Sequence, residues 1–161
     1  MTAIDALYFQ FEEDFVEDGV RCIPMIVRFK LDACGIKLKL KEWSNLNVEE
    51  RNRLAENPCH SSQEIKMYRI FVQDLVRNRC HHEATPLTID HDPLWAQMNT
   101  VPTLLQDKIS EFNIHISLNH WKALNTLQRF ALIKLCGGGH EHKNLLKALD
   151  EFHLAGEHVS A

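Results

Sequence analysis

Apolar residues recur at every third position in two stretches of the chain, one in each half. The first stretch has Leu40, Trp43 and Leu46, and the second has Leu118, Trp121 and Leu124. Residues with this spacing lie on one side of a helix. The pattern therefore predicts a helix in each half that presents one apolar face to a core.

Both stretches belong to a longer internal repeat in which corresponding positions are 78 residues apart. An alignment without gaps brings nine identical pairs into register: Pro24/Pro102, Lys30/Lys108, Ile36/Ile114, Leu40/Leu118, Trp43/Trp121, Leu46/Leu124, Asn47/Asn125, Arg51/Arg129 and Leu54/Leu132. A fixed period of this kind is typical of a duplicated supersecondary unit. We interpret residues 23–78 and 101–153 as two copies of one helical unit.

Residues that start or end helices predict the first helix of each copy and the link that follows it. Proline suits the start of a helix, so helices are expected to begin near Pro24 and Pro102. Gly35 and Asn113 tolerate the left-handed conformation that ends a helix. Short extended links are then predicted at residues 36–38 and 114–116.

Further helices begin at capping boxes, in which an N-cap side chain and the residue three positions later bind each other's backbone N–H. The pairs are Asn47/Glu50, Asn125/Gln128 and Ser61/Glu64. The last helix of each copy has an apolar face, formed by Ile65, Tyr68, Val72 and Leu75 in one and by Leu145, Leu149 and Phe152 in the other. The predicted fold is an all-α, single-domain helical bundle (residues 1–161) of two pseudo-repeated helix–link–helix–helix units, with minor short extended segments.

Two segments lie outside the repeat. Residues 84–100 contain prolines and turn-forming aspartates, and we interpret them as an ordered connector anchored by Trp95. Residues 1–20 form an N-terminal arm. The alternation of Phe9 and Phe11 about Gln10 predicts an extended strand there, packed on the protein's own core.

Composition restricts the class of protein. The chain has 161 residues, 45% of them hydrophobic, and a formal net charge of -4. It therefore has no global positive field for nucleic acid or an anionic membrane. No apolar run approaches the roughly 20 residues of a membrane span, and no signal peptide is apparent, so we expect a cytoplasmic protein. Five cysteines at irregular spacing are expected to be reduced thiols.

Charge is segregated near the N-terminus. Six acidic residues without a base, from Asp5 to Asp18, precede a basic stretch containing Arg21, Arg28, Lys30, Lys37, Lys39 and Lys41. The arm could fold onto the basic surface, or the two could face a partner protein. Solvated helix faces with internal ion pairs explain the same pattern. The sequence leaves these three interpretations open.

No motif establishes a catalytic or metal site. Histidine and cysteine pairs such as Cys80-His81-His82 lack a spacing that fixes two ligands on one element, so no metal and no cofactor are expected. The loop Gly137–Gly139 lacks the lysine of a phosphate loop and is explained by helix termination. A cysteine nucleophile would need a neighbouring base that no local motif provides, so catalytic residues are not expected. The alternative is a small-molecule or metal site lined by Cys22, Cys136 and His140.

Several strings resemble the nitrate reductase-associated proteins found chiefly in cyanobacteria. They are residues 9–16 (FQFEEDFV), 21–25 (RCIPM), 27–32 (VRFKLD), 35–38 (GIKL) with Trp43, and 127–135 (LQRFALIKL) followed by His140-Glu141. The family commonly has Asn after that His-Glu pair, where this chain has His142.

The resemblance implies an accessory protein and not a reductase. It would bind the cytosolic assimilatory nitrate reductase, in its apo or holo form, and support assembly or acquisition of the molybdenum cofactor. We predict that the partner-binding residues are Glu12, Glu13, Asp14, Arg21, Cys22, Arg28, Lys30, His140 and Glu141. Because His142 departs from the family pattern, the resemblance alone assigns no role to the loop of His140 and Glu141. Residues that differ between the two copies, such as Arg28, which aligns with Gln106, are where a working surface is expected.

Overall fold

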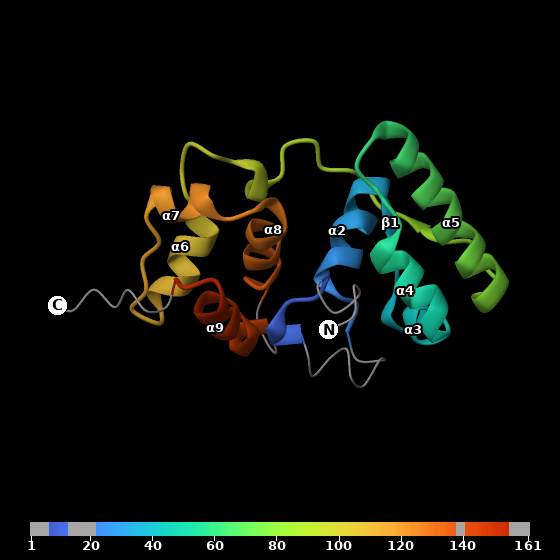
Figure 1. Ribbon diagram of the computed structural model, residues 1–161, viewed down its shortest axis with the longest axis horizontal. Helices are drawn as coiled ribbons and strands as arrows, with labels where there is room; N and C mark the ends of the chain where they lie inside the picture. The colour runs from blue at the N-terminus through green and yellow to red at the C-terminus, as the bar shows by residue number, and fades with distance from the viewer. Residues whose placement is uncertain (1–6, 13–21, 138–140, 155–161) are drawn as a thin grey trace. The chain divides into compact units, whose positions relative to one another are not determined.

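A computed structural model of the chain describes residues 7–12, 22–137 and 141–154, with only the backbone of Glu141 and His142. These residues are mostly helical, with one small sheet of two strands, so the predicted fold class is confirmed (Figure 1). The chain divides into two compact units, residues 1–90 and 91–161. The interpretation of the two halves as copies within a single domain stays a prediction. Among the described helices, none combines the length and apolar character needed to cross a membrane.

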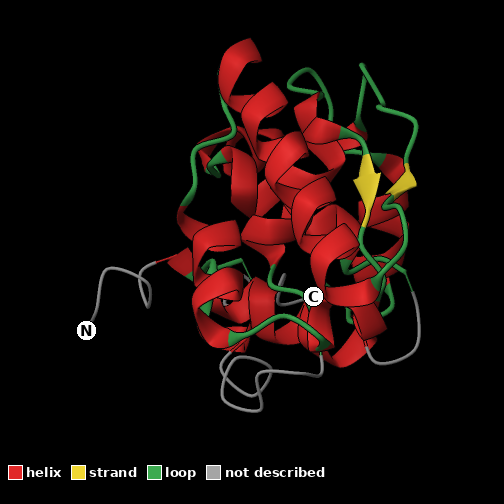
Figure 2. Cartoon of the chain, turned by 90° about the vertical axis from the view of Figure 1, so that its right-hand side faces the viewer, coloured by secondary structure: helices red, strands yellow, loops and turns green. Residues whose placement is uncertain are grey.

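The first unit is built around its longest helix. Its elements are η2 (Gln10–Glu12), α2 (Met25–Cys34), β1 (Ile36–Lys37), α3 (Leu40–Ser44), α4 (Val48–Glu56), α5 (Ser62–Cys80) and β2 (Thr85–Pro86). Helix α5 contacts α2, α3 and α4. Strands β1 and β2 pair antiparallel, with Lys37 opposite Thr85 (Figure 2). The unit is therefore a helical cluster in which a short strand pair holds the link after α2.

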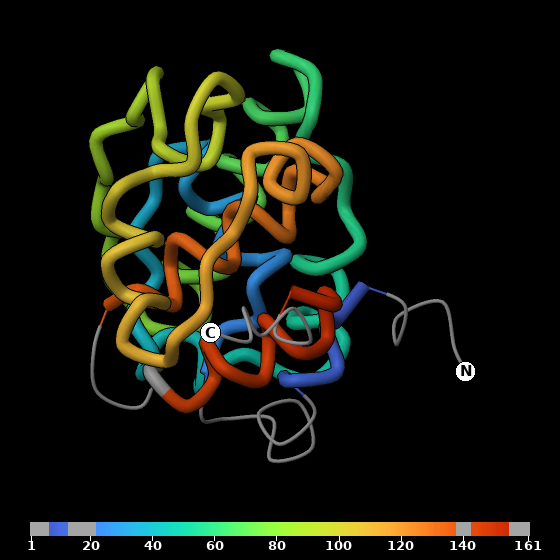
Figure 3. The backbone as a smooth tube through the Cα atoms, turned by 90° about the vertical axis from the view of Figure 1, so that its left-hand side faces the viewer, coloured from blue at the N-terminus to red at the C-terminus, as the bar shows by residue number. Residues whose placement is uncertain are grey.

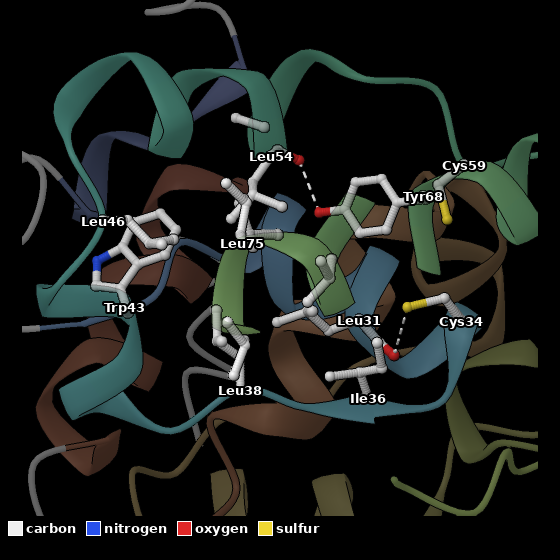
Figure 4. Close-up of a cluster of buried hydrophobic side chains, with 14 residues drawn as sticks. Leu31, Cys34, Ile36, Leu38, Trp43, Leu46, Leu54, Cys59, Tyr68 and Leu75 are labelled. Atoms are coloured by element: carbon white, nitrogen blue, oxygen red, sulfur yellow. Dashed lines mark hydrogen bonds between the residues drawn. The ribbon is translucent and has the colours of Figure 1, made fainter. Parts of the chain in front are cut away.

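The core of the first unit combines apolar side chains from all its main elements. Tyr68 of α5 lies among Leu31, Ile36 and Leu54 (Figure 4). Val72 of the same helix belongs to the same cluster. The Tyr68 hydroxyl donates a 2.8 Å hydrogen bond to the carbonyl of Leu54, so this buried polar group is satisfied. The apolar face predicted for α5 is therefore confirmed.

Helix boundaries follow the predicted signals. The capping boxes of Asn47/Glu50, Asn125/Gln128 and Ser61/Glu64 are all present. Gly35 adopts φ 77° and ends α2; a Cβ there would lie 3.0 Å from the guanidinium of Arg69 and from the carbonyl of Leu87. Glycine is required at this position both for its conformation and for the close approach.

The second unit contains η3 (Leu94–Ala96), α6 (Thr103–Ser110), α7 (Leu118–Ala123), α8 (Thr126–Lys134) and α9 (Glu141–Glu151), in the order that Figure 3 follows from yellow-green to red. Leu145, Leu149 and Phe152 of α9 are buried as predicted. Trp95 lies edge-on to Phe130, with ring centroids 6.3 Å apart, and its carbonyl accepts a 3.0 Å hydrogen bond from Arg129 Nε. The prediction that Trp95 anchors its segment is confirmed.

Two local predictions were wrong. Residues 10–12 form a 3₁₀ helix in place of the strand expected around Phe9 and Phe11, whose rings stack 5.3 Å apart. Leu40 is 49% exposed, because it begins α3 and lies outside the core that Trp43 and Leu46 enter.

Candidate functional site

The described parts of the N-terminal strings, residues 9–12 and 22–32, meet at the N-terminal end of α2. Pro24, the N-cap, offers no capping side chain, so the first N–H groups of the helix need another acceptor. Glu12 supplies it: Oε1 accepts a 2.7 Å hydrogen bond from the Met25 N–H, and Oε2 accepts one of 3.1 Å from the Phe9 N–H. A carboxylate also complements the positive end of the helix dipole. The Glu12 side chain, 3% exposed, thereby ties η2 to α2.

Arg28 and Cys22 lie at the same end of α2 but closer to solvent. Arg28 is one turn into the helix and partly exposed, with Nη1 3.9 Å from the sulfur of Met25. Cys22 is exposed. Of the predicted partner-binding residues, the structure therefore brings Glu12, Cys22 and Arg28 to one end of one helix, with only the last two accessible.

Lys30 points to a different element. Its Nζ donates 2.6 Å hydrogen bonds to the carbonyls of Ala55 and Asn57, at the C-terminal end of α4. Burial lowers the pKa of this ammonium group, an effect that Cys59 and Glu56 oppose through their charges. Carbonyls at a helix C-terminus lack intrahelical donors and favour a cation. Lys30 thus acts as a C-terminal cap of α4.

Two arginines of the first unit cap helix ends in the same way. Arg69 Nη1 donates to the carbonyls of Cys34 and Gly35, where α2 ends, at 2.6 and 3.0 Å. Arg51 donates to the last carbonyls of α3, those of Trp43 and Ser44, at 3.2 and 3.1 Å. Many cations of this unit therefore serve the scaffold and not a ligand.

The remaining predicted residues are divided between the second unit and the undescribed part of the chain. Glu13, Asp14, Arg21 and His140 lie outside the described residues, and Glu141 begins α9 with its side chain undescribed. The Cys136 thiol donates a 3.2 Å hydrogen bond to the carbonyl of Leu132. Within the described ranges, no group of three or more His, Cys, Asp or Glu is arranged to hold a metal ion. The alternative site of Cys22, Cys136 and His140 stays a prediction.

A polar group that the sequence reasoning missed is buried under α3. Glu42 is 3% exposed, and its Oε1 accepts a 2.8 Å hydrogen bond from the Lys39 N–H. Its Oε2 lies 3.3 Å from His82 Nε2, in an orientation that makes no hydrogen bond. The spacing of Lys39 and Glu42 could have signalled half a capping box, but Lys39 lacks the usual capping side chain.

Two thiols are buried in the first unit. Burial raises the pKa of Cys34 to about 12 and that of Cys59 to about 11. Since the thiolate is the nucleophilic form, these two residues are poor candidates for covalent chemistry near neutral pH. The exposed Cys22 is the more accessible thiol.

The comparisons identify a family. A family model described as conserved nitrate reductase-associated protein matches residues 8–152, nearly the whole chain. No curated protein and no solved structure matches the chain. The family match agrees with the resemblance of the strings at the N-terminal end of α2 and along α8.

Proposed function

The chain belongs to the family of conserved nitrate reductase-associated proteins, and on this premise we propose that it is an accessory protein that binds assimilatory nitrate reductase. Binding would support assembly of the reductase or its acquisition of the molybdenum cofactor, in the cytoplasm. The observation that carries this proposal is the extent of the match, residues 8–152. The description of the family names a protein associated with the reductase and not the reductase itself. This favours a role in which the chain does not catalyse a reaction.

The N-terminal end of α2 is the part of the predicted surface best placed for such a contact. Arg28 is partly exposed, whereas the aligned Gln106 is bound to its own unit, donating to the Ile116 carbonyl at 2.6 Å. A guanidinium suits recognition of carboxylates because its donors match their geometry. Arg28, with Cys22 at the same end of α2, is therefore proposed to contact the reductase. Arg21, Glu13 and Asp14, which lie outside the described residues, are proposed to join them.

Glu12 and Lys30 are assigned supporting roles in this proposal. Both use their polar atoms on backbone groups of the first unit, at the start of α2 and at the end of α4. Replacing either would damage the scaffold, so a loss of binding in such variants would not locate the interface.

The test is a pull-down of purified apo and holo nitrate reductase with the tagged chain. We expect at least one form to be retained, and cells lacking the protein to hold reductase with a lower molybdenum content. Arg28→Glu should weaken retention by about threefold to tenfold, and more at low salt. Lys66→Glu, an exposed change on α5, is the matched control and should have no effect. The proposal fails if neither form of the reductase binds and its molybdenum content is unchanged.

A further inference from the structure

Three lysines and a leucine project from the link after α2 and from the first turn of α3. Lys37, Lys39 and Lys41 are exposed, and Leu40 between them is 49% exposed. We call residues Lys37, Lys39, Leu40 and Lys41 the lysine strip. An exposed leucine between lysines gains nothing from contact with water. A partner protein could pack on the leucine and pair with the lysines at the same time.

The strip is held on a fixed support. Ile36 and Leu38 alternate with the lysines and are 1% and 8% exposed, so the segment is anchored in the core. Lys37 is paired with Thr85 in the small sheet, and the Lys39 N–H is bound by Glu42. Since successive outward residues of an extended segment are roughly 7 Å apart, Lys37 and Lys39 present two cations at a set spacing. Little backbone ordering would be needed on binding.

The charge of the strip is uncompensated within the described part of the chain. None of its three lysines forms an ion pair there, whereas Arg53, Arg77 and Arg79 are paired with Glu49, Glu83 and Glu50 at 2.6, 2.9 and 3.0 Å. The nearest carboxylate in sequence, Glu42, is buried, with one oxygen bound to the backbone of Lys39 and the other facing His82. The strip is therefore a local positive patch on a chain of net charge -4.

The aligned positions of the second unit have no such patch. Lys37, Lys39 and Lys41 align with His115, Ser117 and Asn119, and Leu40 aligns with Leu118, which is half-buried. Ser117 is used within its own helix, as the N-cap that accepts a hydrogen bond from the His120 N–H. Because the second unit forms the corresponding helix without lysines at these positions, the lysines of the first unit are not needed to form α3.

We infer that the lysine strip docks an acidic segment of the partner protein, with an apolar side chain of that segment packed on Leu40. The inference rests on the proposed function, so the segment belongs to nitrate reductase. Carboxylates on alternate residues of an extended peptide have the same spacing as Lys37 and Lys39. Three cations on a net acidic chain are too few to follow a nucleic acid backbone, and the exposed leucine favours a peptide over a phosphate.

The strip is tested by binding of purified nitrate reductase to the triple variant Lys37→Gln/Lys39→Gln/Lys41→Gln. The matched control, Lys66→Gln/Lys122→Gln/Lys143→Gln, removes the same charge from exposed lysines elsewhere. The strip variant should bind about tenfold more weakly and the control within about twofold of the natural chain. Leu40→Ala should also weaken binding, while Met67→Ala, which removes another exposed apolar side chain, should not.

The outcomes separate this inference from the proposed function. Unchanged binding by the strip variant, with weaker binding by Arg28→Glu, would overturn the strip and leave the function standing. No binding by any form of the chain would overturn both. Carbodiimide cross-linking of the complex should join Lys37, Lys39 or Lys41 to carboxylates of the reductase, and cross-links confined to other lysines would count against the strip. Lysine-dependent binding of a DNA oligonucleotide or of phosphatidylglycerol vesicles in place of the reductase would also overturn it.

Discussion

Trp43 and Trp121 occupy aligned positions, yet only one of them has a partner for its indole N–H. Trp121 Nε1 donates a 2.6 Å hydrogen bond to the carbonyl of Gln97. Trp43 is 3% exposed, and its Nε1 makes no hydrogen bond. Arg51 lies 5.6 Å from the centre of the Trp43 ring and covers its face without accepting from it. The same residue is thus satisfied in one unit and carries an unpaired buried donor in the other.

Phenylalanine substitutions should separate these two states. Trp121→Phe breaks a hydrogen bond and leaves a carbonyl unpaired, whereas Trp43→Phe removes a donor that had no partner. The two substitutions remove a similar area of buried apolar surface, so they differ mainly in the hydrogen bond. The free energy of unfolding should therefore fall about 1 kcal/mol further for Trp121→Phe. Urea denaturation followed by circular dichroism measures the difference. Equal losses would mean that the indole N–H of Trp121 contributes nothing net.

Alkaline conditions should destabilise the first unit through its buried thiols. The pKa values of Cys34 and Cys59 are raised in the folded state to about 12 and about 11, from 9.0. Their contribution is therefore complete below pH 9, and is lost as the pH rises through 11 to 12, because the unfolded thiols ionise first. The raised pKa of Tyr68 acts in the same direction above pH 10, and the lowered pKa of Lys30 acts in the opposite one.

The measurement is the urea unfolding free energy between pH 8 and 11. The natural chain should lose stability steadily above pH 9, and Cys34→Ala, although less stable at pH 8, should lose less with each pH unit. Cys22→Ala, which removes an exposed thiol, should keep the slope of the natural chain. A slope that Cys34→Ala leaves unchanged would refute the assignment.

At the scale of elements, local signals predicted the helices well. A capping box needs only two residues three positions apart, and the boxes at Asn47, Ser61 and Asn125 each begin a helix as predicted. A helix can be ended by a single residue in the left-handed conformation, and Gly35 and Asn113 adopt φ angles of 77° and 59°. These features depend on a single turn of chain, which is why sequence alone suffices for them.

Contacts between elements could not be predicted in this way. Glu12 binds the start of α2 from 13 residues away, and Lys30 binds the end of α4 from 25 and 27 residues away. Nothing in the local sequence distinguishes these two from the accessible Arg28 in the same charged stretch. The sequence therefore points to this charged stretch but does not tell which of its charged side chains face inward, since burial decides that. The prediction that Leu40 is buried was wrong for the same reason. The periodicity of apolar residues does not show where a helix enters the core.

Removal of the Lys30 ammonium group should loosen the end of α4. Lys30→Met keeps the length of the side chain but leaves the carbonyls of Ala55 and Asn57 without their donor. The cost should be about 1.5–3 kcal/mol of unfolding free energy, because the donor is charged. Hydrogen exchange should accelerate at the amides of residues 53–57, while Lys66→Met, on the exposed side of α5, should leave exchange and stability unchanged. Uniform acceleration across the unit would point to global destabilisation and not to a cap.

At the scale of the whole molecule, the net charge of the chain does not favour attraction to an acidic partner. The chain has 22 acidic and 18 basic residues, so its average field repels a negatively charged protein. Only a local patch can guide the approach under these conditions, and its influence extends about one Debye length, roughly 10 Å at 0.1 M salt. The lysine strip and Arg28 are the cations proposed to guide this approach.

Association kinetics should therefore depend on where the positive charge lies and not on its total. The strip variant and its control, Lys66→Gln/Lys122→Gln/Lys143→Gln, have the same net charge, so any average-field effect is equal in both. Measured by surface plasmon resonance over a series of salt concentrations, the strip variant should bind the reductase more slowly, and its association rate should change less with salt than that of the control. Leu40→Ala should instead raise the dissociation rate, because short-range packing acts after encounter. Equal salt dependence in the two charge variants would assign the steering to the net charge and exclude the strip as its source.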